Sequence, residues 1–573
     1  MTTSEFFNQR YSFVMIFMTA VVLDLLLATQ PAYAETKPRL ILQITIDQLR
    51  GDLPTRYYNR LTEGGFRYLW EKGVVYRNAH HSHANTETIV GHTTLATGTT
   101  PSIHGMVGNV WFDRETGQTT YNVEDPRYRL LTKGAGVDAK TEIDPTQRIA
   151  KTDGRSPAAI LVSTFADELR SYTNGQSKVF GVSIKDRGAI AMAGHSGKAF
   201  WFSKNNGEFV TSTYYFNEYP AWVSTWNAQK KPQRYAETSW QLLHEQSSYL
   251  FAASDDRAWE TDLAGFGRVF PHAYGKGDGK YFNTLLTLSP AGDALTLDFA
   301  KTLLIEEQLG QDTITDYLSV SFSSTDYVGH IFGPSSLEAE DNILRLDRQL
   351  AELFKFVDQK VGLSNTLIVL SADHGGPDSP GYLKRLKIPA GYVQPEAWDK
   401  VAAIGRIKQR FNITGPLIES YQHPYLYLSQ AVLNDTAIER AVLEASIIDE
   451  LSSFPGIALA VSSTALRHGN VPDTWLYRSV LNNFHAKRSG DIYIVFEPNW
   501  FINDFDGLRV AVTHGSPWRY DTFVPIIFAG AEIQPRHVFR QVSTVDIAPT
   551  LSAYIGTKPP SGATGKLLVE LFK

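Results

Sequence analysis

The chain has no cysteine among its 573 residues. This absence excludes disulfide bonds, thiolate catalysis and zinc sites built from cysteine, so any bound metal must be held by histidines and carboxylates. The sequence has 15 histidines, which is enough for such a site. An excess of positive charge is also lacking, since the formal net charge is −6. Nucleic-acid-binding domains are normally basic, so we expect no nucleic-acid partner.

Long apolar runs are lacking after the N-terminus. There, a positive charge precedes an apolar run over 13–27, and residues 32–34 read Ala-Tyr-Ala, a small-residue cleavage signature. This pattern is typical of a secretory signal peptide, which we assign to residues 1–34. A membrane anchor is the alternative, but the run is short for a span and Asp24 interrupts it. We therefore expect residues 35–573 to form a periplasmic or secreted protein with no stable membrane span.

Four apolar segments are each followed by polar residues, which is typical of buried strands in a parallel sheet covered on both faces. They are residues 40–46, 317–322, 366–371 and 508–513. Between the second and the third, apolar residues recur at helical spacing over 343–361. Strand, helix and strand in this order form a crossover unit. The sequence therefore predicts an α/β fold with a mostly parallel central sheet flanked by helices.

A chain of 573 residues is too long for one ordinary core, so we expect one large domain with insertions or several domains. Residues 195–295 are rich in Trp, Tyr, Gly and Asn, and residues 378–500 combine helical patches with many Pro and Gly. Neither follows the alternation of strand and helix. We predict that both are insertions in a catalytic domain over 35–573 and that they form a cap over the sheet. The secretory signal and a cap built from the same chain make a monomer the default.

Side chains that can bind metal gather where the predicted strands end. Ligands of open α/β sheets bind outside the carboxyl ends of the strands, so these side chains should lie close together. A single aspartate after a strand is more often a turn or a helix cap, and a lone histidine is more often an ordinary loop residue, so the prediction rests on the set. Oxygen and nitrogen ligands together suit zinc better than calcium or magnesium. The six residues are Asp47, Asp326, His330, Asp373, His374 and His514.

A second group of residues surrounds Thr88. Small and apolar residues from Ile89 onward, closed by Gly98, predict a short helix. Thr88 would sit at its N-terminus, where free N–H groups and the helix dipole attract anions such as phosphate. Threonine is also a common helix N-cap, and without the metal ligands that interpretation would be preferred.

These motifs make the sequence resemble the alkaline phosphatase superfamily, and within it the exported phosphate-irrepressible enzymes that use threonine. The resemblance covers most of the chain after residue 34 and is weakest in the two insertions. The nucleophile motif of that family, Thr-x-x-Gly-His, matches Thr88 to His92, whereas the neighbouring Thr86 lacks Gly and His at the required positions. A downstream motif ends on Asn109. The resemblance implies that Thr88 is the nucleophile and that Asn109 contacts a phosphoryl oxygen.

The resemblance also divides the metal ligands between two zinc ions. It implies that one zinc ion is held by Asp47, Thr88, Asp373 and His374. It implies that the other is held by Asp326, His330 and His514. All seven positions carry residue types that the resemblance requires.

The segment 182–187 resembles the Lys-x-Arg pair of the same family, here Lys185 and Arg187. If both lie on a strand, the two side chains point to the same side. Two cations there can bind the non-bridging oxygens of a terminal phosphate, with arginine offering two parallel donors. A monoester dianion presents those oxygens, whereas a diester has an alkyl group in the way. A solvated surface pair is the alternative on the sequence alone, and the resemblance favours substrate binding.

We therefore predict an exported two-zinc alkaline phosphatase that hydrolyses small phosphate monoesters through a phosphothreonine intermediate. A phosphodiesterase or nucleotide pyrophosphatase of the same superfamily would share the zinc ligands, Thr88 and Asn109, but would not need Lys185 and Arg187. A sulfatase would need a nucleophile in a Cys/Ser-x-Pro-x-Arg context, which is absent around Thr88. An envelope protein that binds glycans or partners without catalysis is a further alternative, and the complete set of ligands argues against it.

Overall fold

The computed structural model describes residues 37–253, 255–395, 398, 402–505, 507–531 and 533–572. The predicted signal peptide, residues 1–34, lies outside the described residues. The chain divides into two units, residues 1–37 and 38–573, and every element below belongs to the second.

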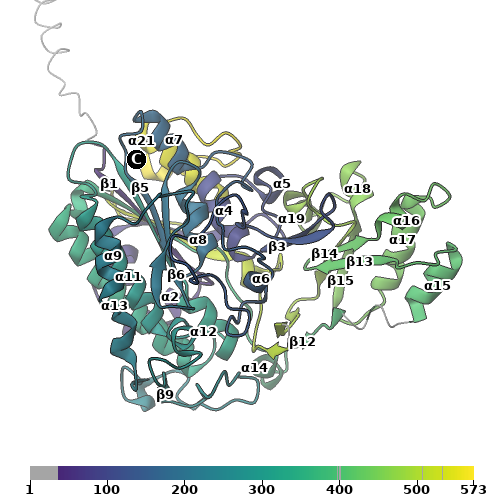
Figure 1. Ribbon diagram of the computed structural model, residues 1–573, viewed down its shortest axis with the longest axis horizontal. Helices are drawn as coiled ribbons and strands as arrows, with labels where there is room; N and C mark the ends of the chain where they lie inside the picture. The colour runs from purple at the N-terminus through teal and green to yellow at the C-terminus, as the bar shows by residue number, and fades with distance from the viewer. Residues whose placement is uncertain are drawn as a thin grey trace, which may run out of the picture. The chain divides into compact units, whose positions relative to one another are not determined.

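The largest element is a ten-stranded sheet with a parallel centre (Figure 1). Five neighbouring strands pair in parallel, in the order β11 (Thr366–Ser371), β1 (Leu40–Ile46), β10 (Asp316–Phe322), β5 (Val179–Ser183) and β6 (Lys198–Ser203). Antiparallel strands flank this centre, namely β20 (Phe523–Gly530) beside β11 and β7 (Glu208–Val210) beside β6. β2 (Val74–His80) pairs with β20 and carries the short strands β21 (Arg536–Val538) and β22 (Val542–Ser543). The sheet is mixed and mostly parallel, as the sequence predicts.

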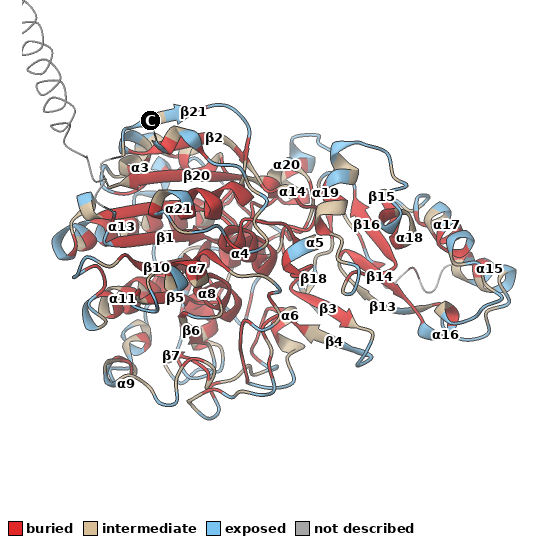
Figure 2. Ribbon diagram, turned by 90° about the horizontal axis from the view of Figure 1, so that it is seen from above, coloured by how far each residue is buried: buried red, intermediate tan, exposed pale blue. Residues whose placement is uncertain are grey.

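Helices cover both faces of this sheet, so every residue of β1, β10 and β11 is buried (Figure 2). Leu42 and Ile44 belong to the core shared with α11 (Pro290–Glu306) and α13 (Leu337–Lys360). Ile41 belongs to the core shared with α7 (Phe165–Tyr172) and α21 (Ile547–Ile555). Because successive side chains of a strand point to opposite faces, a strand between two helical layers needs an unbroken apolar run. That requirement made these strands readable in the sequence.

Three of the four predicted strands are confirmed as β1, β10 and β11, and the predicted helix after β10 is α13, preceded by α12 (Ser324–Phe332). The fourth prediction, a sheet strand over 508–513, is wrong. Only β19 (Leu508–Arg509) forms there, and it pairs with β18 (Asp504–Phe505) in a separate hairpin. Ala511 donates its N–H to the His330 carbonyl at 2.8 Å, which ties this segment to the end of α12. The sheet position beside β11 is taken by β20.

The first predicted insertion differs from the structure at its boundary. Residues 195–210 do not form a cap, because β6 and β7 belong to the large sheet. Farther on, α9 (Ala221–Ala228) packs Trp226 against Phe299 of α11, with the ring centroids 5.4 Å apart. Aromatic residues of this segment, such as Trp226, therefore pack against the helices that cover the sheet.

The second predicted insertion, residues 378–500, contains a second sheet with its own core (Figure 1). Its strand order is β13 (Ile418–Gln422), β14 (Tyr425–Leu428), β16 (Ile492–Phe496) and β15 (Ile457–Ser462). Two helices share the core of this sheet, α15 (Ala402–Arg410) and α17 (Arg440–Leu451). The turn between β13 and β14 carries His423, which lines the cavity described below.

Candidate active site

The order of the strands brings the predicted ligands to one edge of the large sheet. β5, β10, β1 and β11 are adjacent and parallel, so their carboxyl ends lie side by side. Asp47 directly follows β1, and Asp373 follows β11 after one residue. Asp326 and His330 lie one turn apart in α12, on the same face of the helix, as their spacing predicts.

The first group of ligand atoms comes from Asp47, Asp373 and His374, and all three side chains are fully buried. His374 Nε2 lies 3.4 Å from Asp47 Oδ1 and 3.6 Å from Asp373 Oδ2. Neither Asp47 Oδ1 nor His374 Nε2 makes a hydrogen bond to any described residue. Buried polar atoms without partners are rare and costly, so two of them facing each other fit a bound cation.

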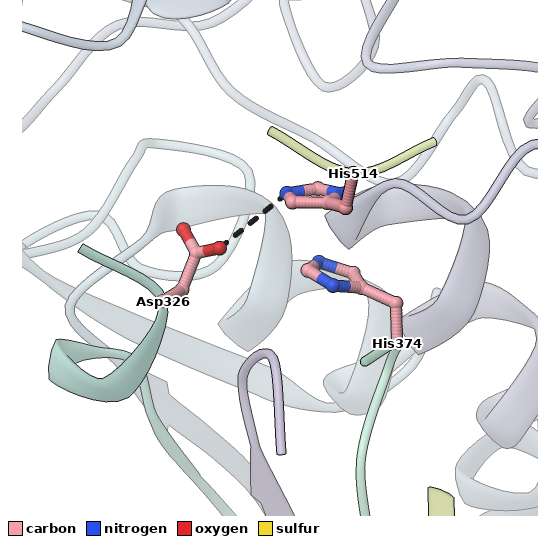
Figure 3. Close-up of side chains that lie close together, drawn as sticks. All are labelled: Asp326, His374 and His514. Carbon is pink, nitrogen blue, oxygen red and sulfur yellow. Dashed lines mark ion pairs between the residues drawn. The ribbon is translucent and has the colours of Figure 1, made fainter. Parts of the chain in front are cut away.

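The second group surrounds Asp326. His330 Nε2 lies 3.2 Å and His514 Nε2 lies 3.4 Å from Asp326 Oδ1. Figure 3 shows Asp326, His374 and His514 pointing toward one another. The rings of His374 and His514 stack with centroids 3.6 Å apart, so the two groups adjoin. By distance His374 could serve either group, whereas the resemblance assigns it to the first.

The three histidines share one arrangement of hydrogen bonds, and it leaves Nε2 of each ring able to bind a metal. In each ring Nδ1 lies within 2.9 Å of a backbone carbonyl oxygen, on Val512 for His330, Thr86 for His514 and Gly375 for His374. A ring that donates from Nδ1 keeps its lone pair on Nε2, the atom that faces the carboxylates.

The electrostatics also favour a cation at this edge. Burial lowers the pKa of His374 and His514, so both rings are neutral and can act as ligands. Burial and the nearby Asp373 carboxylate raise the pKa of Asp47 well above its usual range. A cation bound here would offset that repulsion, and the mixed oxygen and nitrogen donors suit zinc.

Thr88 is the first residue of α4 (Thr88–Thr97), one residue after the N-cap position. The interpretation of Thr88 as a mere N-cap is therefore wrong, because Glu87 occupies the cap position. Lys185 Nζ and Arg187 Nη2 approach Thr88 Oγ1 to 3.4 Å and 3.3 Å. Asn109 Oδ1 accepts the N–H of Ile89 at 3.2 Å, which leaves the NH₂ end of Asn109 able to donate to a ligand.

Lys185 and Arg187 approach Thr88 from the start of a helix, whereas the prediction placed them on a strand. β5 ends at Ser183, so the two residues are not on a strand; Arg187 lies in the first turn of α8 (Asp186–Ala193) and Lys185 precedes it. Their exposed fractions are 1% and 2%, which rules out a solvated surface pair. Lys185 Nζ lies 2.7 Å from Asp47 Oδ2 and also pairs with Asp326.

A cavity of about 180 Å³ opens beside Thr88. Polar residues that line it include Thr88, Asn109 and Arg187, and apolar ones include Ile143, Ile331, Phe501, Phe505 and Leu508. None of the described residues between 195 and 295 lines it.

Two further residues at the site, Gln48 and Asp144, are not indicated by the sequence motifs. Gln48 donates its backbone N–H to Asp373 at 3.2 Å and its side-chain amide to Asp326 at 2.8 Å. Its place beside Asp47 at a strand end was the signal available. Asp144 lines the cavity and pairs with Arg187 at 2.8 Å, but its position before Pro145 indicates only a helix start.

The Gly-His half of the nucleophile motif has a structural reason. A Cβ on Gly91 would lie 1.9 Å from the backbone oxygen of Asp373, so α4 can approach the end of β11 only at a glycine. His92 Nδ1 lies 2.9 Å from the Thr88 carbonyl oxygen and 3.1 Å from Asp373 Oδ2. Its Nε2 lies 2.9 Å from Ser321 Oγ on β10. The motif therefore sets the distance between the nucleophile candidate and a metal ligand.

Comparison with known proteins agrees with this geometry. A family model described as type I phosphodiesterase / nucleotide pyrophosphatase matches residues 41–517. The alkaline phosphatase PafA of Elizabethkingia meningoseptica is 34% identical over 96% of this chain and 97% of that protein. The alkaline phosphatase PhoV of Synechococcus elongatus is 34% identical over 94% of this chain and 93% of that protein. A relative from Myroides odoratus, named a calcium-transporting ATPase, is 35% identical over 93% of this chain and 94% of that protein.

The chain belongs to the type I phosphodiesterase / nucleotide pyrophosphatase family. Within it, the chain falls in the alkaline phosphatase class that its motifs predict, and it is a phosphatase. The crystal structure of PafA matches with a TM-score of 0.85 at 33% identity, over 94% of this chain and 99% of PafA. That match confirms the predicted alkaline-phosphatase-like fold.

The close approach at Gly91 yields a prediction. We expect Gly91→Ala to lower both the metal content and the turnover of an aromatic phosphate monoester, because the added Cβ must push α4 away from Asp373. Overpacking of this kind also destabilises a protein, typically by about 1–3 kcal/mol. Metal analysis, steady-state kinetics and thermal unfolding measure the three effects.

Gly405→Ala is the matched control, because nothing lies within 4 Å of a Cβ built there. It should leave metal content and turnover unchanged. Normal metal content and turnover in Gly91→Ala would contradict the spacing role given to this glycine.

Proposed function

We propose that the chain is an exported two-zinc alkaline phosphatase that hydrolyses small phosphate monoesters through a phosphothreonine on Thr88. The proposal rests on one observation, the environment of the Thr88 hydroxyl. Two buried cations, Lys185 and Arg187, approach it to 3.4 Å and 3.3 Å, beside two groups of metal-competent ligands. Asp47, Thr88, Asp373 and His374 would hold one zinc ion, and Asp326, His330 and His514 the other.

The reaction begins when Thr88 Oγ1 attacks the phosphorus of the bound ester in line with the departing alcohol oxygen. A phosphorus–oxygen bond forms to Thr88, and the bond to the alcohol breaks. Water then attacks the phosphothreonine, inorganic phosphate leaves, and the threonine hydroxyl is regenerated. Zinc bound at the two groups would supply Lewis acidity, which makes a hydroxyl more acidic and stabilises a departing oxygen.

The chain's own residues orient the phosphoryl group and balance its charge. Lys185, Arg187 and the NH₂ end of Asn109 would donate to the non-bridging oxygens, where charge is held throughout the transfer. The first N–H groups of α4 add the positive end of a helix dipole at Thr88. These donors are fixed before substrate arrives, because the side chains of Lys185 and Arg187 are buried in the fold.

A phosphodiesterase or nucleotide pyrophosphatase is the second candidate, favoured by the description of the matching family model. The buried Lys185 and Arg187 favour the monoesterase, since a diester puts an alkyl group where one of these cations would bind an oxygen. Among the described residues that line the cavity, Arg187 is the only one with a permanent positive charge. A substrate with several phosphates would meet the carboxylate of Asp504, with no further permanent cation among the described lining residues to balance it.

The remaining features follow from the same proposal. Residues 1–34 would direct export to the periplasm or the medium and be removed, leaving a monomer of 35–573 whose 378–500 segment acts as a cap. In the part of the chain that the structure describes, no helix is long and apolar enough to cross a membrane.

The nucleophile assignment predicts the behaviour of Thr88→Ala. This variant should lose nearly all monoester turnover and keep its zinc, because Asp47, Asp373 and His374 remain. Thr97→Ala, at the other end of α4, is the control, since among the described residues its hydroxyl donates to the Thr93 carbonyl and contacts no candidate ligand. Turnover close to wild type in zinc-loaded Thr88→Ala would show that another group attacks phosphorus.

The substrate assignment predicts a selective loss. Replacing Lys185 and Arg187 together by Ala should reduce kcat/KM for a monoester at least about 100-fold more than for a diester, since removing one such donor already costs about 10²–10³ in rate. Arg406→Ala, which removes an exposed pair with Glu450, should change neither value. Equal losses for both substrates would reject the monoesterase proposal.

A further inference from the structure

Arg187 divides its guanidinium between the reactive hydroxyl and the protein frame. Nη2 lies 3.3 Å from Thr88 Oγ1. Nη1 lies 2.8 Å from Asp144 Oδ2 and 3.4 Å from the Tyr121 hydroxyl. A long arginine side chain has many rotamers, so one end must be held if the other is to meet a phosphoryl oxygen in a fixed place.

The Asp144 carboxylate is itself fixed by several hydrogen bonds. It caps α6 (Pro145–Arg148), where its Oδ1 accepts the Thr146 N–H at 2.9 Å and the Thr146 hydroxyl at 2.6 Å. Its Oδ2 faces Arg187. One carboxylate oxygen thus binds the helix start, and the other binds the guanidinium at 2.8 Å with a longer contact to the Gln147 amide at 3.5 Å.

The place of Asp144 needs an explanation, because it lines the cavity that would receive a phosphate dianion. An unpaired carboxylate there would repel the substrate. Burial alone would raise the pKa of Asp144, but the Arg187 guanidinium holds it well below its usual range, so the carboxylate stays charged and paired. Arginine has five N–H donors, and the contact with Asp144 leaves others for the substrate.

We propose that Asp144 is a positioning residue that sets the preference for monoesters by fixing Arg187 against the transferred phosphoryl group. The inference extends the proposed function, because it assumes that Arg187 binds a non-bridging oxygen. Asp144 itself contacts no reacting atom. Its effect should therefore appear only where Arg187 is used.

Asp144→Asn tests the inference on the zinc-loaded enzyme. Asparagine still caps a helix, so α6 should persist while the charge that holds Arg187 is lost. Monoester kcat/KM should fall about 10-fold to 100-fold, in line with the cost of small misplacements at an active site. The Kd for inorganic phosphate, measured by titration calorimetry, should rise by a similar factor, and diester kcat/KM should change less than about twofold.

Asp125→Asn is the matched control. Asp125 is also buried and paired with an arginine, Arg127 at 2.7 Å, but it does not line the cavity. It should leave all three values within about twofold. Asp144→Ser provides a second variant if the asparagine variant folds poorly, because serine also caps a helix and is too short to reach Arg187.

A double-mutant cycle with Arg187→Ala separates positioning from a general structural effect. In the Arg187→Ala background, Asp144→Asn should change monoester kcat/KM less than about twofold. An equal loss in both backgrounds would overturn the inference. So would unchanged monoester turnover and phosphate binding in the folded single variants.

The cycle also distinguishes the inference from the proposal beneath it. If Arg187→Ala lowers the ratio of monoester to diester turnover and Asp144→Asn does not, only the role of Asp144 is wrong. If Arg187→Ala leaves that ratio unchanged, Arg187 does not bind the phosphoryl group as proposed. The positioning role of Asp144 is then rejected as well.

Discussion

The structure depends on the balance of buried charge at the carboxyl edge of the sheet. Asp47, Asp326 and Asp373 are brought together with almost no exposure to water. Burying one such ion costs several kcal/mol unless an opposite charge lies close by. The ammonium of Lys185 meets part of that need, at 2.7 Å from Asp47 and in contact with Asp326. The rest suits bound cations, so folding and catalysis draw on the same charges.

The backbone around these charges leaves little room for variation. The parallel pairing of β5, β10, β1 and β11 fixes which strand ends meet. Asp47 directly follows β1, Asp373 follows β11 after one residue, and Asp326 lies in the first turn of α12, just after β10. Gly91 then lets α4 approach the backbone of Asp373, and His92 bonds to both the helix and the strand end. The candidate nucleophile is thus held by contacts with the elements that carry the ligands. Such a site can be rigid before any substrate binds.

The sequence allowed the sheet, and the gathering of candidate ligands at its edge, to be predicted where one local rule was decisive. Strands buried on both faces must be apolar throughout, which identified β1, β10 and β11 and the polar residues after them. The same rule failed for 508–513, because an apolar run also packs well around the end of a helix. The prediction placed Lys185 and Arg187 on a strand, but they lie at the start of α8, from which both side chains still approach the Thr88 hydroxyl. Gln48 and Asp144 depend on partners far along the chain, Asp373 and Arg187, and no spacing rule reveals such contacts.

Gln48 has one more consequence for the pair of metal groups. Its backbone N–H holds a carboxylate of the first group, and its side-chain amide holds the carboxylate of the second. A Cβ on Gly329 of α12 would lie 1.8 Å from its side-chain oxygen, so that glycine leaves the room that the glutamine occupies. Gln48 therefore bridges the two groups of candidate ligands, as does Lys185, which contacts a carboxylate of each group. The spacing of the two groups is set by protein contacts, so a substitution at Gln48 would disturb both groups at once.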